Sequence, residues 1–251
     1  MITFEIFLFL ALAQASVSTA LKPLSVPPVY PAGVSSPALF ALDDNLVKRY
    51  ADEVGEVTRV LAPGTSLKER KRKIFEMQSR RNAETLAALD RSAPAAVENK
   101  TIEKVFAALV SHPVARVDAV TQYDKRGDVG FCFGRAMLVH SLFVREGVKP
   151  AQLAKIFAVG KLRYKKQLWD FHMATLVRGE GTWVVVDSLF DKPLPHAEWV
   201  RRVTEFAINR TTPEIRFFVT DARKFQPAYA AYRQHDLLEP DLKNYFDALF
   251  Q

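Results

Sequence analysis

The sequence predicts an α+β protein, in which a helical first half is followed by one further helix and a set of antiparallel strands. Apolar residues recur at helical spacing as far as about residue 110, whereas short β-type runs dominate after residue 150. Two of these runs are joined by a turn with two glycines, which is typical of an antiparallel hairpin. Helices and hairpins that occupy separate parts of a chain are the pattern of α+β folds.

The composition is typical of a globular chain with a sizeable core. Of the 251 residues, 49% are hydrophobic and 25% are charged, and the net charge is +7. This positive charge is modest, and neither an aromatic-interleaved basic motif nor a zinc-ligand spacing accompanies it. We therefore expect no nucleic-acid partner, no metal ion and no cofactor. The densest basic run, residues 68–73, is expected to form a solvated helix face.

The first 20 residues predict a secretory signal peptide. Residues 6–13 form an apolar run too short to span a bilayer, and small residues that suit a cleavage site follow at 13–15 and 18–20. The start of the chain departs from the usual pattern, because it has Glu5 and no lysine or arginine. No other stretch is long and apolar enough for a stable membrane span, so we expect a secreted or periplasmic protein.

Residues 21–95 are predicted to form a helical N-terminal region. Five prolines between residues 22 and 37 indicate an extended linker, and helical spacing then predicts helices at 43–61 and 66–89. Ser66 and Glu69 have the spacing of a capping box at the start of the second helix. The region is either a helical subdomain or a removable pro-segment, and both interpretations stay open.

Residues 96–251 are predicted to form a separate C-terminal domain. The loop 178–181 joins its second and third strands as a hairpin. Its predicted elements are helices from residue 98 and at 132–145, strands at 155–160, 171–177, 182–188 and 215–220, and a final helix at 239–249.

Cys132 is the only cysteine of the chain, and it lies where the helix 132–145 begins. The positive end of a helix dipole favours the thiolate form of a cysteine at that position. A lone cysteine also excludes an internal disulfide, so the fold depends on its core. Cys132 is therefore a candidate nucleophile, although a lone cysteine is as often a small buried hydrophobic residue.

A histidine and an aspartate lie in the two strands of the hairpin. If all four residues 178–181 form the loop, His172 falls directly opposite Asp187, and the carboxylate can orient the imidazole. The second imidazole nitrogen is then left for a thiol. A three-residue loop instead pairs His172 with Ser188 and turns Asp187 to the other face. Both registers stay open.

The other histidines are less suitable partners for the thiol. His140 lies eight residues further along the helix of Cys132, which is about 12 Å along the helix axis. His196 follows a proline in a predicted loop, and His235 lies in a polar segment, so both are expected at the surface.

Three segments resemble the bacterial protein-glutaminase family, within the transglutaminase-like and papain-like superfamily. They are residues 130–136 (GFCFGRA), 169–174 (WDFHMA) and 187–190 (DSLF). The resemblance implies a core in which a Cys-bearing helix packs on an antiparallel sheet, with residues 96–251 as the catalytic domain. It further implies Cys132 as the nucleophile, His172 as the general base and acid, and Asp187 as the group that orients His172.

Enzymes of this family hydrolyse the side-chain amide of glutamine in proteins, giving glutamate and ammonia through a thioester. The resemblance therefore implies protein or peptide substrates that bear glutamine, and Trp169 and Phe133 are candidate walls of the substrate slot. Two features depart from the family. Its secreted members carry disulfides, which a chain with one cysteine cannot form internally, and no processing motif marks the end of a pro-segment.

Two other classes of function remain open. The same Cys-His-Asp triad serves a transglutaminase or a cysteine peptidase, which differ in the amide attacked and in the acceptor of the acyl group. A non-catalytic protein-interaction module is the other alternative. The complete triad argues against such a module, because a decayed site usually lacks one member.

Overall fold

The computed structural model describes residues 61–92, 95–124, 130–208, 215–224 and 240–251, together with residues 52, 55, 56 and 59. The predicted signal peptide, the proline-rich linker and His235 lie outside the described residues, as does most of the helix predicted at 43–61.

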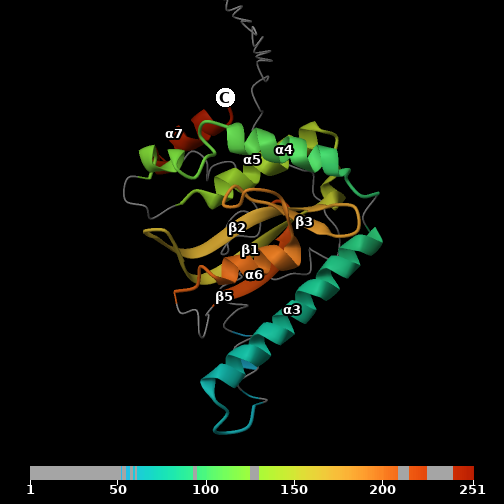
Figure 1. The fold of residues 1–251 in the computed structure, drawn as a ribbon, viewed down its shortest axis with the longest axis vertical. Helices are drawn as coiled ribbons and strands as arrows, with labels where there is room; N and C mark the ends of the chain where they lie inside the picture. Colours follow the sequence, from blue (N-terminus) through green and yellow to red (C-terminus); the bar gives the residue numbers. More distant parts are fainter. Residues whose placement is uncertain are drawn as a thin grey trace, which may run out of the picture.

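A five-stranded antiparallel sheet forms the centre of the protein, with the strand order β4-β3-β2-β1-β5 (Figure 1). The prediction of an α+β fold with an antiparallel sheet is thereby confirmed. β1 and β2 are longer than the predicted strands, because a turn at residues 165–166 joins them as a long hairpin. The strands are β1 (Leu153–Tyr164), β2 (Gln167–Arg178), β3 (Trp183–Val186), β4 (Leu194–Pro195) and β5 (Ile215–Asp221).

Helices cover both faces of this sheet. Figure 1 shows α4, α5 and α7 on one side and α3 and α6 on the other. None of the helices in the described part of the chain has the length and apolar character needed to cross a membrane. The helices are α3 (Leu67–Ser92), α4 (Asn99–Ser111), α5 (Cys132–Arg145), α6 (His196–Thr204) and α7 (Pro240–Leu249), with short 3-10 turns η1 (Ala119–Gln122) and η2 (Pro150–Gln152).

The alternation of side chains along β2 divides the core into two clusters. Met173 and Val177 point to the cluster beneath α4, α5 and α7, whereas Ala174 and Leu176 belong to the cluster beneath α3 and α6. Successive side chains of a strand point to opposite faces, so a sheet with helices on both sides buries both sets. This explains why β1, β2 and β5 each contain a run of six or more consecutive buried residues.

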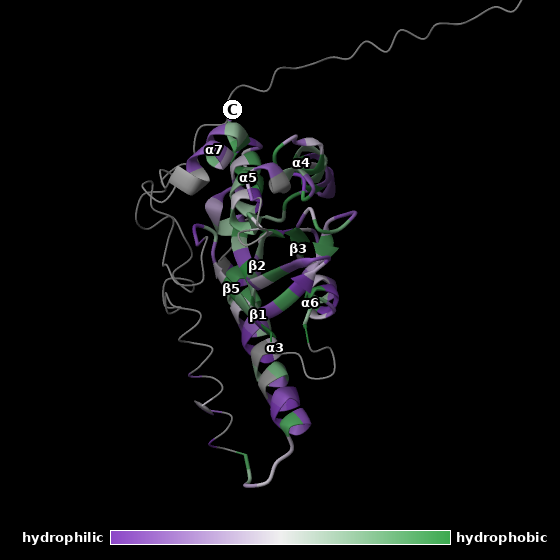
Figure 2. Ribbon diagram, turned by 90° about the vertical axis from the view of Figure 1, so that its left-hand side faces the viewer, coloured by the Kyte–Doolittle hydropathy of each residue, from purple (hydrophilic) through white to green (hydrophobic). Residues whose placement is uncertain are grey.

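The long helix α3 contacts the sheet through its C-terminal half. Leu86 and Leu89 are buried there, and Asp90 accepts hydrogen bonds from Arg178 Nε (2.8 Å) and Trp183 Nε1 (3.0 Å). The N-terminal half is mostly hydrophilic and extends past the sheet (Figure 2). One half of the predicted capping box is present, because Ser66 Oγ accepts a hydrogen bond from the Glu69 N–H at 3.2 Å, whereas the Glu69 carboxylate binds Arg72.

The hairpin of β2 and β3 has neither of the two predicted registers. Val177 pairs with Val184, and the N–H of Gly179 bonds the carbonyl of Thr182 at 2.9 Å, which leaves only two residues in the turn. Gly181 makes this tight turn possible through its positive φ of 82°. The pairing of His172 with Asp187, which assumed a four-residue loop, was therefore wrong by two residues. Because the side-chain period of a strand is also two, the error leaves each side chain on the predicted face.

This register places His172 and Asp187 as diagonal neighbours. The β2–β3 ladder ends at the pair Thr175–Val186. One further step sets Asp187 opposite Ala174, two residues from His172 on the same face of β2. Diagonal neighbours on an antiparallel pair lie about 7–8 Å apart, which long side chains can bridge.

Candidate active site

Cys132 is the first residue of α5, and two left-handed residues set the helix start before it. Gly130 has φ 65° and Phe131 has φ 49°, and the latter costs about 1–3 kcal/mol for a residue with a side chain. The Gly130 N–H donates to Asp124 Oδ2 (2.8 Å), and the Gly130 carbonyl accepts from Arg135 Nη1 (2.7 Å). These buried bonds hold the bend that presents Cys132.

The first turn of α5 offers backbone donors beside the thiol. The first backbone bond of the helix runs from the Arg135 N–H to the Phe131 carbonyl at 3.2 Å. Helix geometry gives the preceding N–H groups, including that of Cys132, no acceptor within the helix. Donors in this position can stabilise an oxygen that becomes negatively charged.

His172 lies on β2 next to this helix start, and its ring is held on three sides. The side chain is only 1% exposed, and its Nε2 is 2.7 Å from Asp187 Oδ2. A carboxylate only accepts, so Nε2 donates this hydrogen bond. The rings of Trp169 and Trp199 stack on His172 with centroid distances of 5.7 and 5.9 Å. The atom Nδ1 has no hydrogen-bond partner among the described residues and is left for Cys132.

Asp187 is a buried carboxylate with three donors. Besides His172, the indole Nε1 of Trp199 donates to its Oδ2 at 2.8 Å, and the Leu189 N–H donates to Oδ1 at 3.0 Å. Sequence reasoning did not find Trp199, because it predicted no helix at 196–204. The spacing of Trp199 and Val203 on α6 was the available signal, but a tryptophan on the apolar face of a helix is more often a packing residue.

The charges of the pair shift both pKa values. Burial alone lowers the pKa of His172, but the charge and hydrogen bond of Asp187 outweigh it, with a smaller contribution from the Cys132 side chain. The pKa of His172 is therefore raised to about 9. Burial raises the pKa of Asp187, whereas His172, Trp199 and the Leu189 N–H lower it, and the net direction is down. His172 is thus cationic and Asp187 anionic at neutral pH.

The two predicted slot residues, Trp169 and Phe133, have different neighbours. Trp169 stacks on His172, and its Nε1 is so close to the Gly130 backbone that a Cβ there would lie 2.6 Å away. Phe133 packs in the core beneath α5, with ring centroids 5.8 Å from Phe131 and 5.9 Å from Phe246. Of the two rings, only that of Trp169 stacks on His172, and the slot role of both residues remains a prediction.

A second buried polar cluster lies beneath α5, and no sequence pattern predicted it. Lys155 on β1 is 1% exposed, and its Nζ donates to the Ala136 carbonyl (2.9 Å) and to Thr175 Oγ1 (2.7 Å). Burial lowers the pKa of Lys155 to about 7, against the charge of Asp221. His140 Nδ1 is 3.0 Å from the Ala222 carbonyl, so this histidine is engaged away from Cys132, as predicted.

The structure places His196 differently from the prediction. His196 begins α6 and is half-buried, so its placement in an exposed loop was wrong. Within the described ranges, no group of three or more His, Cys, Asp or Glu side chains has the arrangement of a metal site.

Comparison with known proteins indicates the class of this chain. Residues 102–203, which include Cys132, His172 and Asp187, match a family model described as Glutaminase. The resemblance to the protein-glutaminase family is confirmed by this match. None of the curated proteins compared with the chain matches it.

Solved structures of protein-glutaminase are also similar to this chain. One crystal structure of protein-glutaminase is 18% identical, with 62% of this chain and 88% of that chain covered and a TM-score of 0.43. A crystal structure of pro-protein-glutaminase is 17% identical, with 62% and 58% covered and the same TM-score of 0.43. The chain therefore spans little more than half of the pro-protein.

Proposed function

We propose that this protein is a cysteine-dependent hydrolase that deamidates glutamine side chains in proteins or peptides to glutamate, with release of ammonia. The observation that carries the proposal is the buried ring of His172, which is bonded to Asp187 through Nε2, keeps Nδ1 unpartnered, and interacts electrostatically with the side chain of Cys132 at the start of α5. The family match over residues 102–203 supports the glutamine amide as the bond attacked. We also propose that the core is papain-like and that the N-terminal 20 residues direct export.

The first step is formation of a thioester. A thiolate is the nucleophilic form of cysteine, so the proposed reactive form of the site is a Cys132 thiolate with a cationic His172. The Cys132 Sγ forms a bond to the carboxamide carbon, and the carbonyl oxygen takes up negative charge near the Cys132 N–H. Nδ1 of His172 gives its proton to the amide nitrogen. The C–N bond then breaks, ammonia leaves, and neutral His172 remains.

The second step is hydrolysis of this thioester. Neutral His172 takes a proton from water at Nδ1, and the resulting hydroxide bonds to the acyl carbon. The C–S bond breaks, which returns Cys132 to its thiolate form and His172 to its cationic form. The product is the glutamate side chain. Asp187 remains ionised throughout, because it keeps Nε2 protonated and stabilises the imidazolium.

Ammonia release tests this proposal most directly. The full chain is incubated with casein and with a peptide that contains an internal glutamine. We expect ammonia and glutamate from the wild type, no product from Cys132→Ala, and wild-type rates from His196→Ala, a half-buried histidine outside the triad. The same peptide with asparagine serves as the substrate control.

Other products would indicate the competing functions. Incorporation of a primary amine in place of water would identify a transglutaminase, and cleavage of the peptide backbone without ammonia would identify a peptidase. Binding of the substrate protein without any product would support a non-catalytic module. Each of these results would contradict the deamidase proposal.

A further inference from the structure

Buried polar atoms without partners gather around the first turn of α5. Among the described residues, seven buried side-chain atoms lack a hydrogen-bond partner, and four of them belong to Arg135, Trp169, His172 and Tyr245. Proteins rarely leave buried polar atoms unpaired, because each loses its bonds to water. The roles proposed above account for Nδ1 of His172 but not for the hydroxyl of Tyr245.

Tyr245 reaches this turn from α7, more than 100 residues further along the chain. Its side chain is fully buried, with its ring stacked on Phe131 at a centroid distance of 3.9 Å. The phenol end lies against Gly134. A Cβ on Gly134 would lie 2.8 Å from the Tyr245 Oη, so a glycine is needed for the hydroxyl to approach the helix start.

The surroundings of the hydroxyl suit an oxygen that bears negative charge. Burial raises the pKa of Tyr245, while Arg135 lowers it and Cys132 raises it, and the net direction is up. The hydroxyl is therefore a neutral donor throughout the pH range of the reaction. Arg135 is a buried cation with one unpartnered nitrogen, Nη2, and the backbone N–H groups of the helix start add further positive partial charge.

We propose that Tyr245 is a further catalytic residue, whose hydroxyl donates a hydrogen bond to the carbonyl oxygen of the substrate as this oxygen becomes an oxyanion. The Tyr245 hydroxyl and the backbone N–H of Cys132 then donate to the same oxygen, although the two residues are far apart in the sequence. This inference rests on the proposed function. It also explains why the hydroxyl has no partner in the free protein, since that partner is the substrate.

The variant Tyr245→Phe in the full chain tests this role. Loss of one oxyanion donor lowers kcat by about 10²–10³-fold, and we expect a decrease in this range with KM changed less than twofold. The Tm should stay equal or rise, because the hydroxyl that is removed has no partner. Tyr123→Phe is the matched control, since Tyr123 packs edge-on against Tyr245 in the same aromatic cluster at 5.4 Å. Its kcat should stay within twofold of the wild type.

A substrate-like aldehyde separates this inference from the proposed function. A peptide with an aldehyde in place of the glutamine carboxamide adds to Cys132 and creates the same tetrahedral oxygen without releasing ammonia. We expect Tyr245→Phe to bind this aldehyde about 10²–10³-fold more weakly, and Tyr123→Phe to bind it as the wild type does.

Each result of these experiments has a distinct meaning for Tyr245 and for the proposed function. Unchanged or increased kcat and aldehyde affinity in Tyr245→Phe would overturn the role, with an increase indicating that Tyr245 obstructs the site. A decrease accompanied by a lower Tm would assign Tyr245 to packing alone and overturn it too. If the wild type binds the aldehyde but releases no ammonia, the deamidase proposal is refuted. The role of Tyr245 is then decided by the aldehyde affinities of the wild type and of Tyr245→Phe. A wild type that does neither would overturn both.

Discussion

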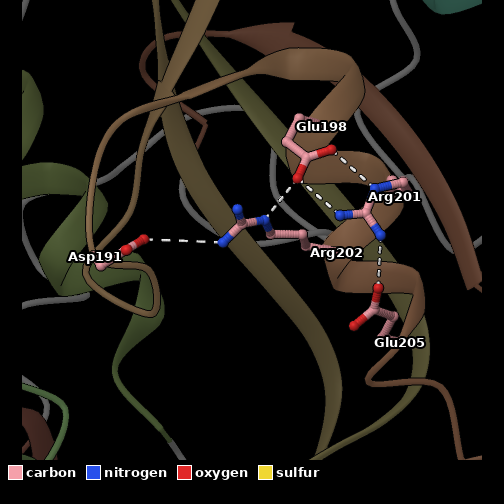
Figure 3. Close-up of polar contacts among 5 residues, drawn as sticks. All are labelled: Asp191, Glu198, Arg201, Arg202 and Glu205. Atoms are coloured by element: carbon pink, nitrogen blue, oxygen red, sulfur yellow. Dashed lines mark hydrogen bonds and ion pairs between the residues drawn. The ribbon is translucent and has the colours of Figure 1, made fainter.

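The two faces of α6 carry polar contacts of the same length in different surroundings. On the inner face, Trp199 donates to Asp187 at 2.8 Å, and Asp187 binds His172 at 2.7 Å. On the outer face, Glu198 binds Arg201 at 2.8 Å and Arg202 at 2.7 Å, and Glu205 and Asp191 extend this network (Figure 3). The side chains of His172 and Asp187 are 1% and 4% exposed, whereas Arg201 is 60% exposed.

The effect of an ion pair therefore depends on its surroundings and not on its contact length. Hydrogen bonds from Arg201 and Arg202 lower the pKa of Glu198 to about 2, but water and salt screen these exposed charges. The buried pair has no such screening. Breaking it leaves a charge without water or partner, which is strongly destabilising. The contacts on the inner face therefore set the charge of His172. The ion pairs on the outer face affect only the surface of α6.

Removing the charge of Asp187 should reduce activity more than any other change at α6. Asp187→Asn should lower kcat/KM by about 10³–10⁴-fold, because an amide neither stabilises the imidazolium nor fixes the tautomer of His172. Ammonia release from the glutamine peptide measures this effect. The matched control is Asp191→Asn on the outer face, which should keep wild-type activity. Equal losses in the two variants would show that the comparison of the faces is mistaken.

The pH dependence of kcat/KM tests whether Asp187 sets the charge of His172. The pKa of His172 is raised to about 9, so kcat/KM of the wild type should fall as the pH rises through 9 and the imidazolium is lost. In Asp187→Asn this limb should move to lower pH, because burial then acts on His172 alone. An alkaline limb at the same pH in both proteins would rule out Asp187 as the cause.

Stability should follow pH with the same sign. The folded protein binds the His172 proton more tightly than the unfolded chain does, whose pKa is near the ordinary value of 6.5. The stabilisation is therefore complete below pH 6.5 and is lost as the pH rises through about 9. Urea unfolding at pH 6, 8 and 10 measures it. The decline attributable to His172 should be absent from Asp187→Asn.

A smaller effect is expected from the indole that supports Asp187. Trp199→Phe keeps an aromatic ring beside His172 but removes one donor to a buried carboxylate, which costs about 1–3 kcal/mol of stability. We expect kcat to fall about tenfold, by analogy with other groups that orient a functional side chain. Trp183→Phe removes a similar bond to Asp90, whose side chain is 47% exposed, and should leave kcat unchanged.

The smallest effect is expected on the outer face. Glu198→Gln weakens the exposed network with Arg201 and Arg202, and we expect Tm to change by no more than about 2 °C. Activity should be that of the wild type. Thermal unfolding at low and high salt measures the contribution, which should shrink as salt is added. A large drop in Tm would contradict the contrast between the two faces.

Local patterns in the sequence were sufficient for much of the fold. The capping residue Ser66 and the helical spacing after it predicted α3, and the start of α5 at Cys132 was predicted to the residue. These elements are specified by neighbours within about four positions, which is the range of helix capping and helical periodicity. The shared face of His172 and Asp187 was one of two open alternatives, since a three-residue loop would have turned Asp187 to the other face.

Three features depend on long-range packing: the hairpin register, the contacts that support Asp187, and the charge of His172. The two-residue turn that displaces Asp187 from His172 depends on packing of the whole hairpin. Trp199 on α6 contacts His172 and Asp187, and Tyr245 on α7 stacks on Phe131 at the start of α5. The short-range patterns that predict helices do not predict these contacts. Cys132 by itself is a thiol at a helix start. Burial and long-range contacts are what place a cationic imidazole beside it.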